Sequence, residues 1–125
     1  MGKYISPEQA AWLAGLLEGE GCFSTNGFST NGERHVRISL RMTDEDVVRK
    51  AATVAGAGSV RIELRKPPRQ TIFVWHVGRI EDVRRIMRAI LPHMGERRTK
   101  RIRELLDAAE SINGYRKYRY LEQVS

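Results

Sequence analysis

The sequence predicts an α+β fold in which an antiparallel β-sheet carries helices on one face. Two stretches alternate strictly between apolar and polar residues, and others repeat apolar residues at helical spacing. The expected order along the chain is helix, strand, strand, helix, strand, strand, helix, helix. The 125 residues fit one domain, residues 1–125, and can bury a core without a disulfide or a structural metal.

The first helix is expected to begin after Ser6, because Ser6 can cap it, Pro7 suits the first helical position and Gln9 can close a capping box. The helix runs through AAWLAGLLEGE and stops at Gly21. It carries a stripe of small residues at i, i+4 and i+8, namely Ala11, Gly15 and Gly19. Such a stripe lets a second helix backbone approach closely, although packing against the chain's own sheet would explain one of the glycines.

Glu20 is expected at the C-terminus of this helix, where the helix dipole disfavours a carboxylate unless a cation is near. If two such helices pair about a two-fold axis, two Glu20 carboxylates converge, and a divalent cation such as Mg²⁺ would neutralise them. A solvated Glu in a helix-ending turn is the alternative, and the spacing alone leaves both open.

The next segments are read as strands and turns. Phe23 to Gly32 repeats FSTNG in tandem, which predicts a strand end and a loop. His35 to Thr43 and Ser59 to Arg65 alternate, so that one face of each is apolar and the other carries arginine. Lys66 to Gln70 is a turn, and Thr71 to Val77 is a strand whose two faces are ambiguous. An open sheet face rich in arginine suits a DNA groove, although it could simply be solvated.

Three further helices complete the prediction: Asp44 to Ala55, Ile80 to Leu91, and about Glu96 to Ile112. The tail from about residue 113 is polar and basic, and we expect it to be loose. A net charge of +7 indicates a polyanionic partner, most often nucleic acid. The single cysteine, Cys22, excludes an internal disulfide and fits an intracellular, reducing compartment, and no apolar run is long enough for a membrane.

Residues 13–21 read LAGLLEGEG and match, position for position, the motif that names the LAGLIDADG homing endonucleases. Glu replaces Asp at both acidic positions. The order αββαββα, GAGSV before the third strand and LPHMGERR after the penultimate helix also resemble this family. The sequence is therefore similar to the single-motif type over most of its length.

This resemblance implies a half-saddle that pairs as a homodimer through the first helix and places its sheet on double-stranded DNA. It implies metal-dependent hydrolysis across the minor groove of a palindromic or near-palindromic site, leaving short 3′ overhangs, with Mg²⁺ or another divalent cation such as Mn²⁺. By the same resemblance, Glu20 is a catalytic metal ligand and Gly19 offers a carbonyl to the metal. Asp44 orders solvent near the scissile phosphate, or is merely a helix cap. Arg97 replaces a catalytic lysine, and its role is electrostatic stabilisation.

Two surfaces are expected, one that binds DNA and one that pairs two chains. The DNA-binding residues are expected on the strands, their loops and the last helix: Arg34, His35, Arg37, Ser39, Arg41, Arg61, Glu63, Arg65, Arg69, Arg98 and Lys100. The dimer interface is expected on the first helix: Ala11, Trp12, Gly15, Leu16, Glu18 and Gly19.

The sequence offers three alternatives to a homodimeric endonuclease: a two-motif monomer, a DNA-binding regulator and an intron maturase. ELLDAAES, residues 104–111, echoes the motif but lacks both glycines, and a two-motif monomer would need a chain of roughly twice this length, so a single-motif homodimer is expected. A non-catalytic DNA-binding regulator or an RNA-binding intron maturase on the same fold would share most of these features. The carboxylate at Glu20 favours the endonuclease over the regulator, whereas the sequence does not separate the maturase.

Overall fold

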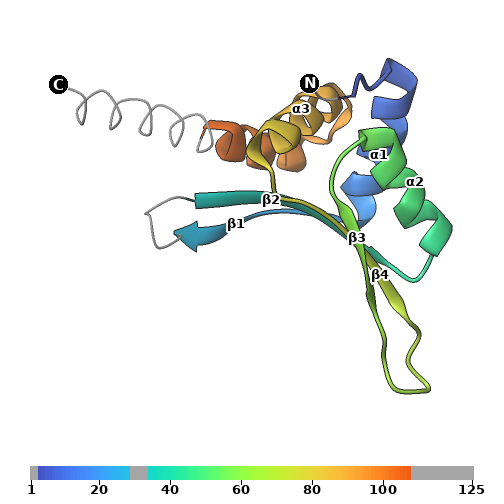
Figure 1. Ribbon diagram of the computed structural model, residues 1–125. Helices are drawn as coiled ribbons and strands as arrows, with labels where there is room; N and C mark the ends of the chain where they lie inside the picture. The colour runs from blue at the N-terminus through green and yellow to red at the C-terminus, as the bar shows by residue number, and fades with distance from the viewer. Residues whose placement is uncertain (1–2, 29–33, 108–125) are drawn as a thin grey trace.

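The computed structural model describes residues 3–28 and 34–107. The elements follow the predicted order (Figure 1): α1 (Pro7–Glu20), β1 (Gly21–Phe28), β2 (Arg34–Met42), α2 (Glu45–Ala55), β3 (Ser59–Glu63), β4 (Ile72–Val77), α3 (Ile80–Ile90) and the 3-10 turn η1 (Leu91–His93). A last helical segment begins at residue 96 and is described as far as residue 107. Its expected continuation to Ile112 and the tail lie outside the described residues.

Helix α1 begins and ends as the sequence predicts. The Ser6 hydroxyl accepts a hydrogen bond from the Gln9 backbone N–H, and the Gln9 side chain accepts one from the Ser6 N–H, which completes the capping box. At the other end, a Cβ on Gly21 would lie 2.7 Å from Leu17 Cδ2 and 2.8 Å from its carbonyl oxygen. Only glycine fits there, so the chain can turn directly from the helix into β1.

The four strands form one antiparallel sheet in the order β1-β2-β4-β3. Helices α1, α2 and α3 lie on one side of this sheet, and the other side is open (Figure 1). The predicted α+β class, with helices on one face of an antiparallel sheet, is therefore confirmed.

The core lies between the sheet and the helices. Leu13 of α1, Ile38 of β2, Trp75 of β4, Ile86 of α3 and Ile102 of the last segment are fully buried there. The Trp75 indole N–H donates to the Ala57 carbonyl at 2.9 Å, so the largest core side chain keeps its polar atom satisfied. Trp75 also settles the ambiguous fourth strand, because its register partner Leu40 faces the same core.

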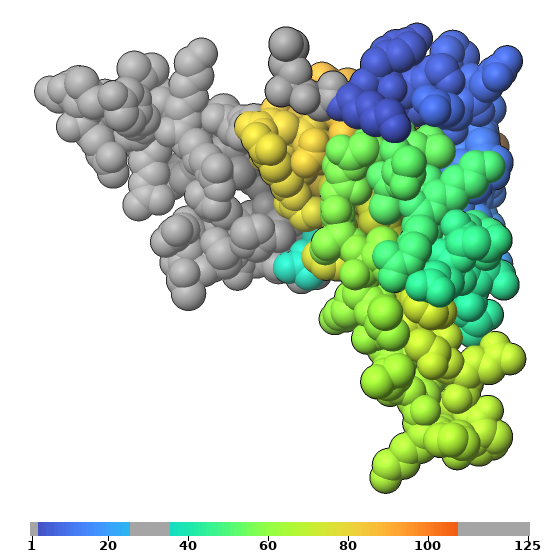
Figure 2. Space-filling view, turned by 45° about the vertical axis from the view of Figure 1, so that its right-hand side comes forward, coloured from blue at the N-terminus to red at the C-terminus, as the bar shows by residue number. Residues whose placement is uncertain are grey.

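The outer part of the hairpin made by β3 and β4 extends past the helices, and there the sequence-based prediction was wrong. Val60, Ile62 and Leu64 were expected to pack under the helices. Val60 is half-buried against the core, but Ile62 is 50% exposed and Leu64 is 85% exposed. The strand ends at Glu63, so Leu64 and Arg65 lie beyond it. Figures 1 and 2 show the hairpin projecting from the body, where no helix covers its apolar face.

Other boundaries differ by a few residues. Strand β1 runs through the first copy of the FSTNG repeat to Phe28, with an irregular register between Thr25 and Phe28. Most of the second copy lies outside the described residues. Helix α3 ends at Ile90, just before Pro92. Within the described part of the chain, no helix has the length and apolar character needed to cross a bilayer.

Candidate nucleic-acid interface and cleavage site

The open face of the sheet is hollowed and basic. Alternation along β2 buries Val36, Ile38 and Leu40 and directs the residues between them to the open side. A hollow of about 380 Å³ is lined on this side by Ser24, Arg37, Ser39, Arg41, Arg61, Val74 and His76. The structure thus brings together four of the predicted DNA-binding residues from two strands that are not neighbours in the sheet.

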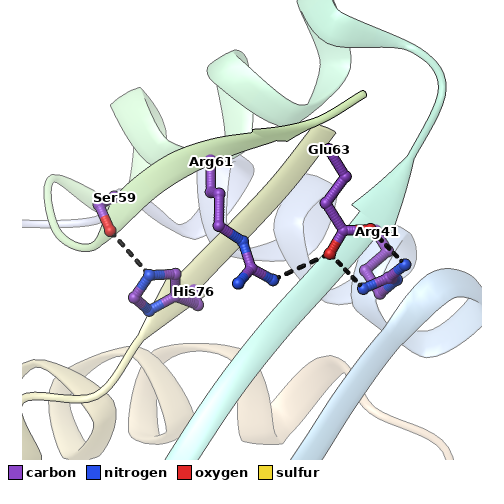
Figure 3. Close-up of polar contacts among 5 residues, drawn as sticks. All are labelled: Arg41, Ser59, Arg61, Glu63 and His76. Carbon is purple, nitrogen blue, oxygen red and sulfur yellow. Dashed lines mark hydrogen bonds and ion pairs between the residues drawn. The ribbon is translucent and has the colours of Figure 1, made fainter. Parts of the chain in front are cut away.

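A network of ion pairs crosses this face (Figure 3). The Arg41 guanidinium donates from Nη1 to Glu63 Oε1 at 2.9 Å and from Nη2 to Glu63 Oε2 at 2.7 Å. Arg61 Nη2 donates to the same Oε1 at 3.0 Å. The hydrogen bonds from Arg41, together with the positive charges of Arg41, Arg61 and Arg65, hold the pKa of Glu63 below its ordinary value. Glu63 therefore stays ionised at neutral pH.

Ser24, Ser59 and His76 are members of this face that the sequence analysis missed. His76 Nε2 and the Ser59 hydroxyl are 2.9 Å apart across a register pair of β3 and β4 (Figure 3). Both faces of β4 are largely apolar, so alternation alone did not show that His76 points to the open side. Ser24 pairs with Arg37 in the register, and only the pairing of β1 with β2 reveals it.

The small-residue stripe on α1 is uncovered in the single chain. Ala11, Gly15 and Gly19 are exposed, and a Cβ built on either glycine would meet no atom within 4 Å. Trp12 and Leu16 flank the stripe, half-buried, and Lys50 Nζ lies 4.3 Å from the centroid of the Trp12 ring. The two glycines therefore serve no packing purpose within the described part of this chain.

Glu18 makes contacts within its own chain. Its Oε2 accepts a hydrogen bond from the Gly95 backbone N–H at 3.2 Å, and its carbonyl accepts one from Arg98 Nη2 at 3.3 Å. A Cβ on Gly95 would lie 2.9 Å from Glu18 Oε1, so glycine at this position permits the contact. Glu18 thus ties the end of α1 to the loop that begins the last helical segment.

A second basic pocket opens beside the end of α1. It measures about 480 Å³ and is lined by Gly21, Cys22, Phe23, Arg97, Arg98 and Arg101. The Arg98 guanidinium lies 5.8 Å from the centroid of the Phe23 ring, and its buried Nε has no hydrogen-bond partner among the described residues. A pocket with three arginines and an unsatisfied donor suits an anion such as a phosphate.

Two of the three predicted catalytic residues, Glu20 and Arg97, lie at the same pocket. Glu20 is exposed at the end of α1, directly before Gly21 in the pocket wall, and Arg97 is in the same wall. Gly21 pairs with Leu40 of β2, and Asp44 follows the end of that strand at Met42. Asp44 occupies the N-cap position of α2 but makes no side-chain capping hydrogen bond, so its carboxylate is not committed to the helix.

The other predicted DNA-binding residues lie outside the hollow of the sheet and the pocket beside α1. Arg65 and Arg69 are exposed in the connection from β3 to β4, and Lys100 is exposed on the last helical segment. Arg34 and His35 belong to β2, but their side chains lie outside the described part of the structure.

One chain supplies only part of the ligand set that a divalent cation needs at this site. Within residues 3–28 and 34–107, no group of three or more His, Cys, Asp or Glu side chains is placed to hold a metal ion. One chain offers the exposed Glu20 carboxylate and the neighbouring Gly19 carbonyl. Since Mg²⁺ requires six oxygen ligands, the others must come from water, a phosphate or a second copy of the chain.

No family model and no curated protein matches the chain. Among solved structures, the homing endonuclease I-CvuI in complex with its target is similar with a TM-score of 0.73 at 16% identity, over 88% of this chain and 71% of I-CvuI. I-CeuI complexed with DNA is similar with a TM-score of 0.68 at 18% identity, over 90% and 58%. The LAGLIDADG meganuclease I-AabMI, bound to uncleaved DNA, is similar with a TM-score of 0.71 at 12% identity, over 90% and 38%.

The chain has the LAGLIDADG fold. It spans 71% of I-CvuI but only 38% of I-AabMI, so it corresponds to a minor part of the longer protein. In this LAGLIDADG fold, the motif residues 13–21 form the second half of α1 and its exit into β1, which puts Glu20 beside the arginine pocket.

Proposed function

We propose that this protein is a site-specific, metal-dependent DNA endonuclease that acts as a homodimer. One observation carries the proposal: Glu20 is exposed at the end of an uncovered small-residue stripe, next to a basic pocket and a basic sheet. The likeness to LAGLIDADG homing endonucleases solved with DNA supports the same function. The exposed Cys22 thiol supports a reducing, intracellular location.

The open sheet face is proposed to bind duplex DNA. Strands of a curved antiparallel sheet fit the major groove, and arginine side chains on them reach both phosphates and guanine edges. The net charge of +7 favours such a partner. Arg37, Arg41 and Arg61 are the central contacts, while Arg65 and Arg69 extend the surface along the hairpin.

The uncovered stripe on α1 is proposed to pair with the same stripe of a second copy. Small residues at i, i+4 and i+8 let two helix backbones approach, and Trp12 and Leu16 beside them supply apolar contact. Two-fold pairing brings two Glu20 residues together and makes the preferred target palindromic or nearly so.

The cleavage site is proposed to lie where α1 ends. Glu20 and the Gly19 carbonyl would hold a divalent cation, Mg²⁺ or Mn²⁺, which when bound lowers the pKa of water and polarises the phosphate. Arg97 stabilises the charge that develops on the scissile phosphate, and Asp44 orients solvent near it. Paired sites on the two strands would cut across the minor groove and leave short 3′ overhangs.

The test is a selection of bound sites from a random duplex library, followed by a cleavage assay of the selected duplex. We expect a near-palindromic consensus, cleavage with Mg²⁺ and none with EDTA. A protein that selects a site but cleaves nothing with either Mg²⁺ or Mn²⁺ would be a DNA-binding regulator. Selection of no duplex would overturn the proposal altogether.

A further inference from the structure

Glu63 is the one residue of the ion-pair network that repels DNA. Its carboxylate lies on the open face, where the proposed DNA backbone would approach, and it stays ionised at neutral pH. A carboxylate weakens attraction to phosphates, so its presence among arginines calls for a compensating effect. The geometry of the network shows what this effect is.

The sheet register brings the two arginines to one carboxylate. Arg41 of β2 and Arg61 of β3 are both register partners of Val74, on the strand between them. Because neighbouring strands lie about 4.8 Å apart, the two backbones are about 10 Å apart on one face. Glu63, two residues after Arg61, reaches across β4 and holds both guanidinium groups (Figure 3).

The hydrogen bonds also determine which edge of Arg41 is engaged. Arg41 uses both Nη1 and Nη2 on the two oxygens of Glu63, at 2.9 and 2.7 Å. A guanidinium reads guanine through the same kind of paired donors, directed at O6 and N7. While Glu63 holds both Nη atoms, Arg41 can approach DNA only through its remaining N–H groups and in one orientation, so it cannot rotate toward whichever base or phosphate is nearest.

We infer that Glu63 is a specificity-determining residue, which joins Arg41 and Arg61 into one oriented unit and lowers affinity for DNA of arbitrary sequence. This rests on the proposed function, because it takes the open face to be the DNA-binding face. Without the Glu63 carboxylate, the two guanidinium groups would be mobile and would bind DNA phosphates whatever the base sequence. Held by it, they contact DNA from fixed positions, and only some base pairs suit them.

The test compares Glu63→Gln with the wild-type protein on the selected duplex and on random duplex, each over a range of salt concentrations. We expect affinity for random duplex to rise several-fold at low salt. The slope of log K against log salt should steepen by about 1 to 2, one for each arginine released to a phosphate. Discrimination at the base pairs under the network should fall about tenfold.

Two further variants separate charge from position. Glu63→Asp keeps the charge on a shorter side chain, so the salt slope should stay near the wild-type value while discrimination falls. Glu81→Gln is the matched control, because Glu81 pairs with Arg79 at 2.8 Å at the start of α3, on the helix side of the sheet. It removes the same charge and should leave discrimination unchanged.

A double-mutant cycle tests the coupling directly. In the wild-type background, the effects of Arg41→Ala and Arg61→Ala on discrimination should be non-additive, and in the Glu63→Gln background they should add. If the wild-type protein is selective and Glu63→Gln shows the same discrimination and the same salt slope, the inference is wrong and the proposed function stands. If the wild-type protein selects no duplex, the proposed function fails and the inference with it.

Discussion

The two basic regions of the molecule use arginine in different ways. In the hollow of the sheet, Arg41 and Arg61 come from different strands and are held by Glu63. In the pocket beside α1, three arginines come from one helical segment, and no carboxylate is among the described residues that line it. Among the described residues, Arg101 makes only a long, exposed ion pair at 3.7 Å, with Glu104 outside the pocket. A carboxylate that accepts two short hydrogen bonds orients a guanidinium, whereas arginines without such a partner mainly supply positive charge. We therefore expect the sheet to discriminate between sequences and the pocket to attract a phosphate.

The largest effect is expected from Glu20→Gln, which removes the carboxylate beside the pocket and leaves the sheet intact. Cleavage should fall by orders of magnitude, because the charge that holds the metal is lost. Binding to the selected duplex should change little. Single-turnover cleavage and equilibrium binding are measured on the same duplex, to check that cleavage is lost and binding is kept. Cleavage at the wild-type rate would show that Glu20 is not the metal ligand.

The next largest effect is expected from Gly15→Leu, which tests whether the two regions work only in a pair of chains. Among residues 3–28 and 34–107 of one chain, a Cβ at this position meets no atom within 4 Å beyond its own helix backbone, so the monomer should still fold. Between two paired helices, the added side chain should cost about 1–3 kcal/mol or more and dissociate the dimer. Sedimentation measures the mass. Gly78→Leu is the control, because Gly78 is equally open but lies outside α1, and it should remain dimeric.

The difference between the sheet and the pocket is tested by comparing Arg61→Ala with Arg97→Ala. Loss of Arg61 should reduce preference at one base pair per half-site by about 1–3 kcal/mol. Loss of Arg97 should slow cleavage and weaken binding to all duplexes alike, with a salt slope smaller by about 1. Binding measured on a panel of single-base variants separates the two. Equal effects of both variants on base preference would contradict the assignment of sequence discrimination to the sheet and phosphate attraction to the pocket.

A smaller effect is expected from Glu18→Ala, which removes a contact between α1 and the start of the last helical segment. The variant loses the hydrogen bond to the Gly95 N–H, so the free energy of unfolding should fall by about 0.5–1.5 kcal/mol. Urea denaturation measures it. Glu104→Ala removes a carboxylate from an exposed pair with Arg101 at 3.7 Å and should change stability far less.

The smallest effect concerns pH and the Glu63 network. The pKa of Glu63 is lowered in the folded protein, mainly by the hydrogen bonds from Arg41, so its stabilisation is present above the ordinary Glu pKa of about 4.3. It is lost as the pH falls through the lowered value. The difference in Tm between wild type and Glu63→Gln should therefore be constant from pH 5 to 8 and vanish in stronger acid. A difference that persists at low pH would show that the network is not ionic.

The sequence predicted those features that depend on local order along the chain. The capping box at Ser6, the stop at Gly21 and the basic face of β2 follow from residues close together, and all three are confirmed. The position of Glu20 at the C-terminus of α1 was also predicted, from the helix pattern and from the resemblance of the motif.

Features that depend on distant residues were not predictable in the same way. The pair of Arg41 with Glu63 joins residues 22 apart, and the contact of Glu18 with Gly95 joins residues 77 apart, so both need the strand register and helix docking. Glu18 was assigned to the dimer interface from its place in the motif helix, and no signal in the sequence indicates its contact with Gly95. Ile62 and Leu64 were misplaced because alternation shows which face is apolar but not where the covering helices end.

The projecting β3–β4 hairpin has a consequence for how such a protein could change its target during evolution. Residues 64–70 are all exposed, and Ile62 is half exposed, so substitutions here disturb little of the core. Exposed substitutions usually alter stability by no more than about 0.5 kcal/mol. Mutations can therefore accumulate along this hairpin and shift sequence preference while the chain continues to fold. A lineage could follow a drifting DNA site by changing its hairpin, with the helix that carries Glu20 left as it is.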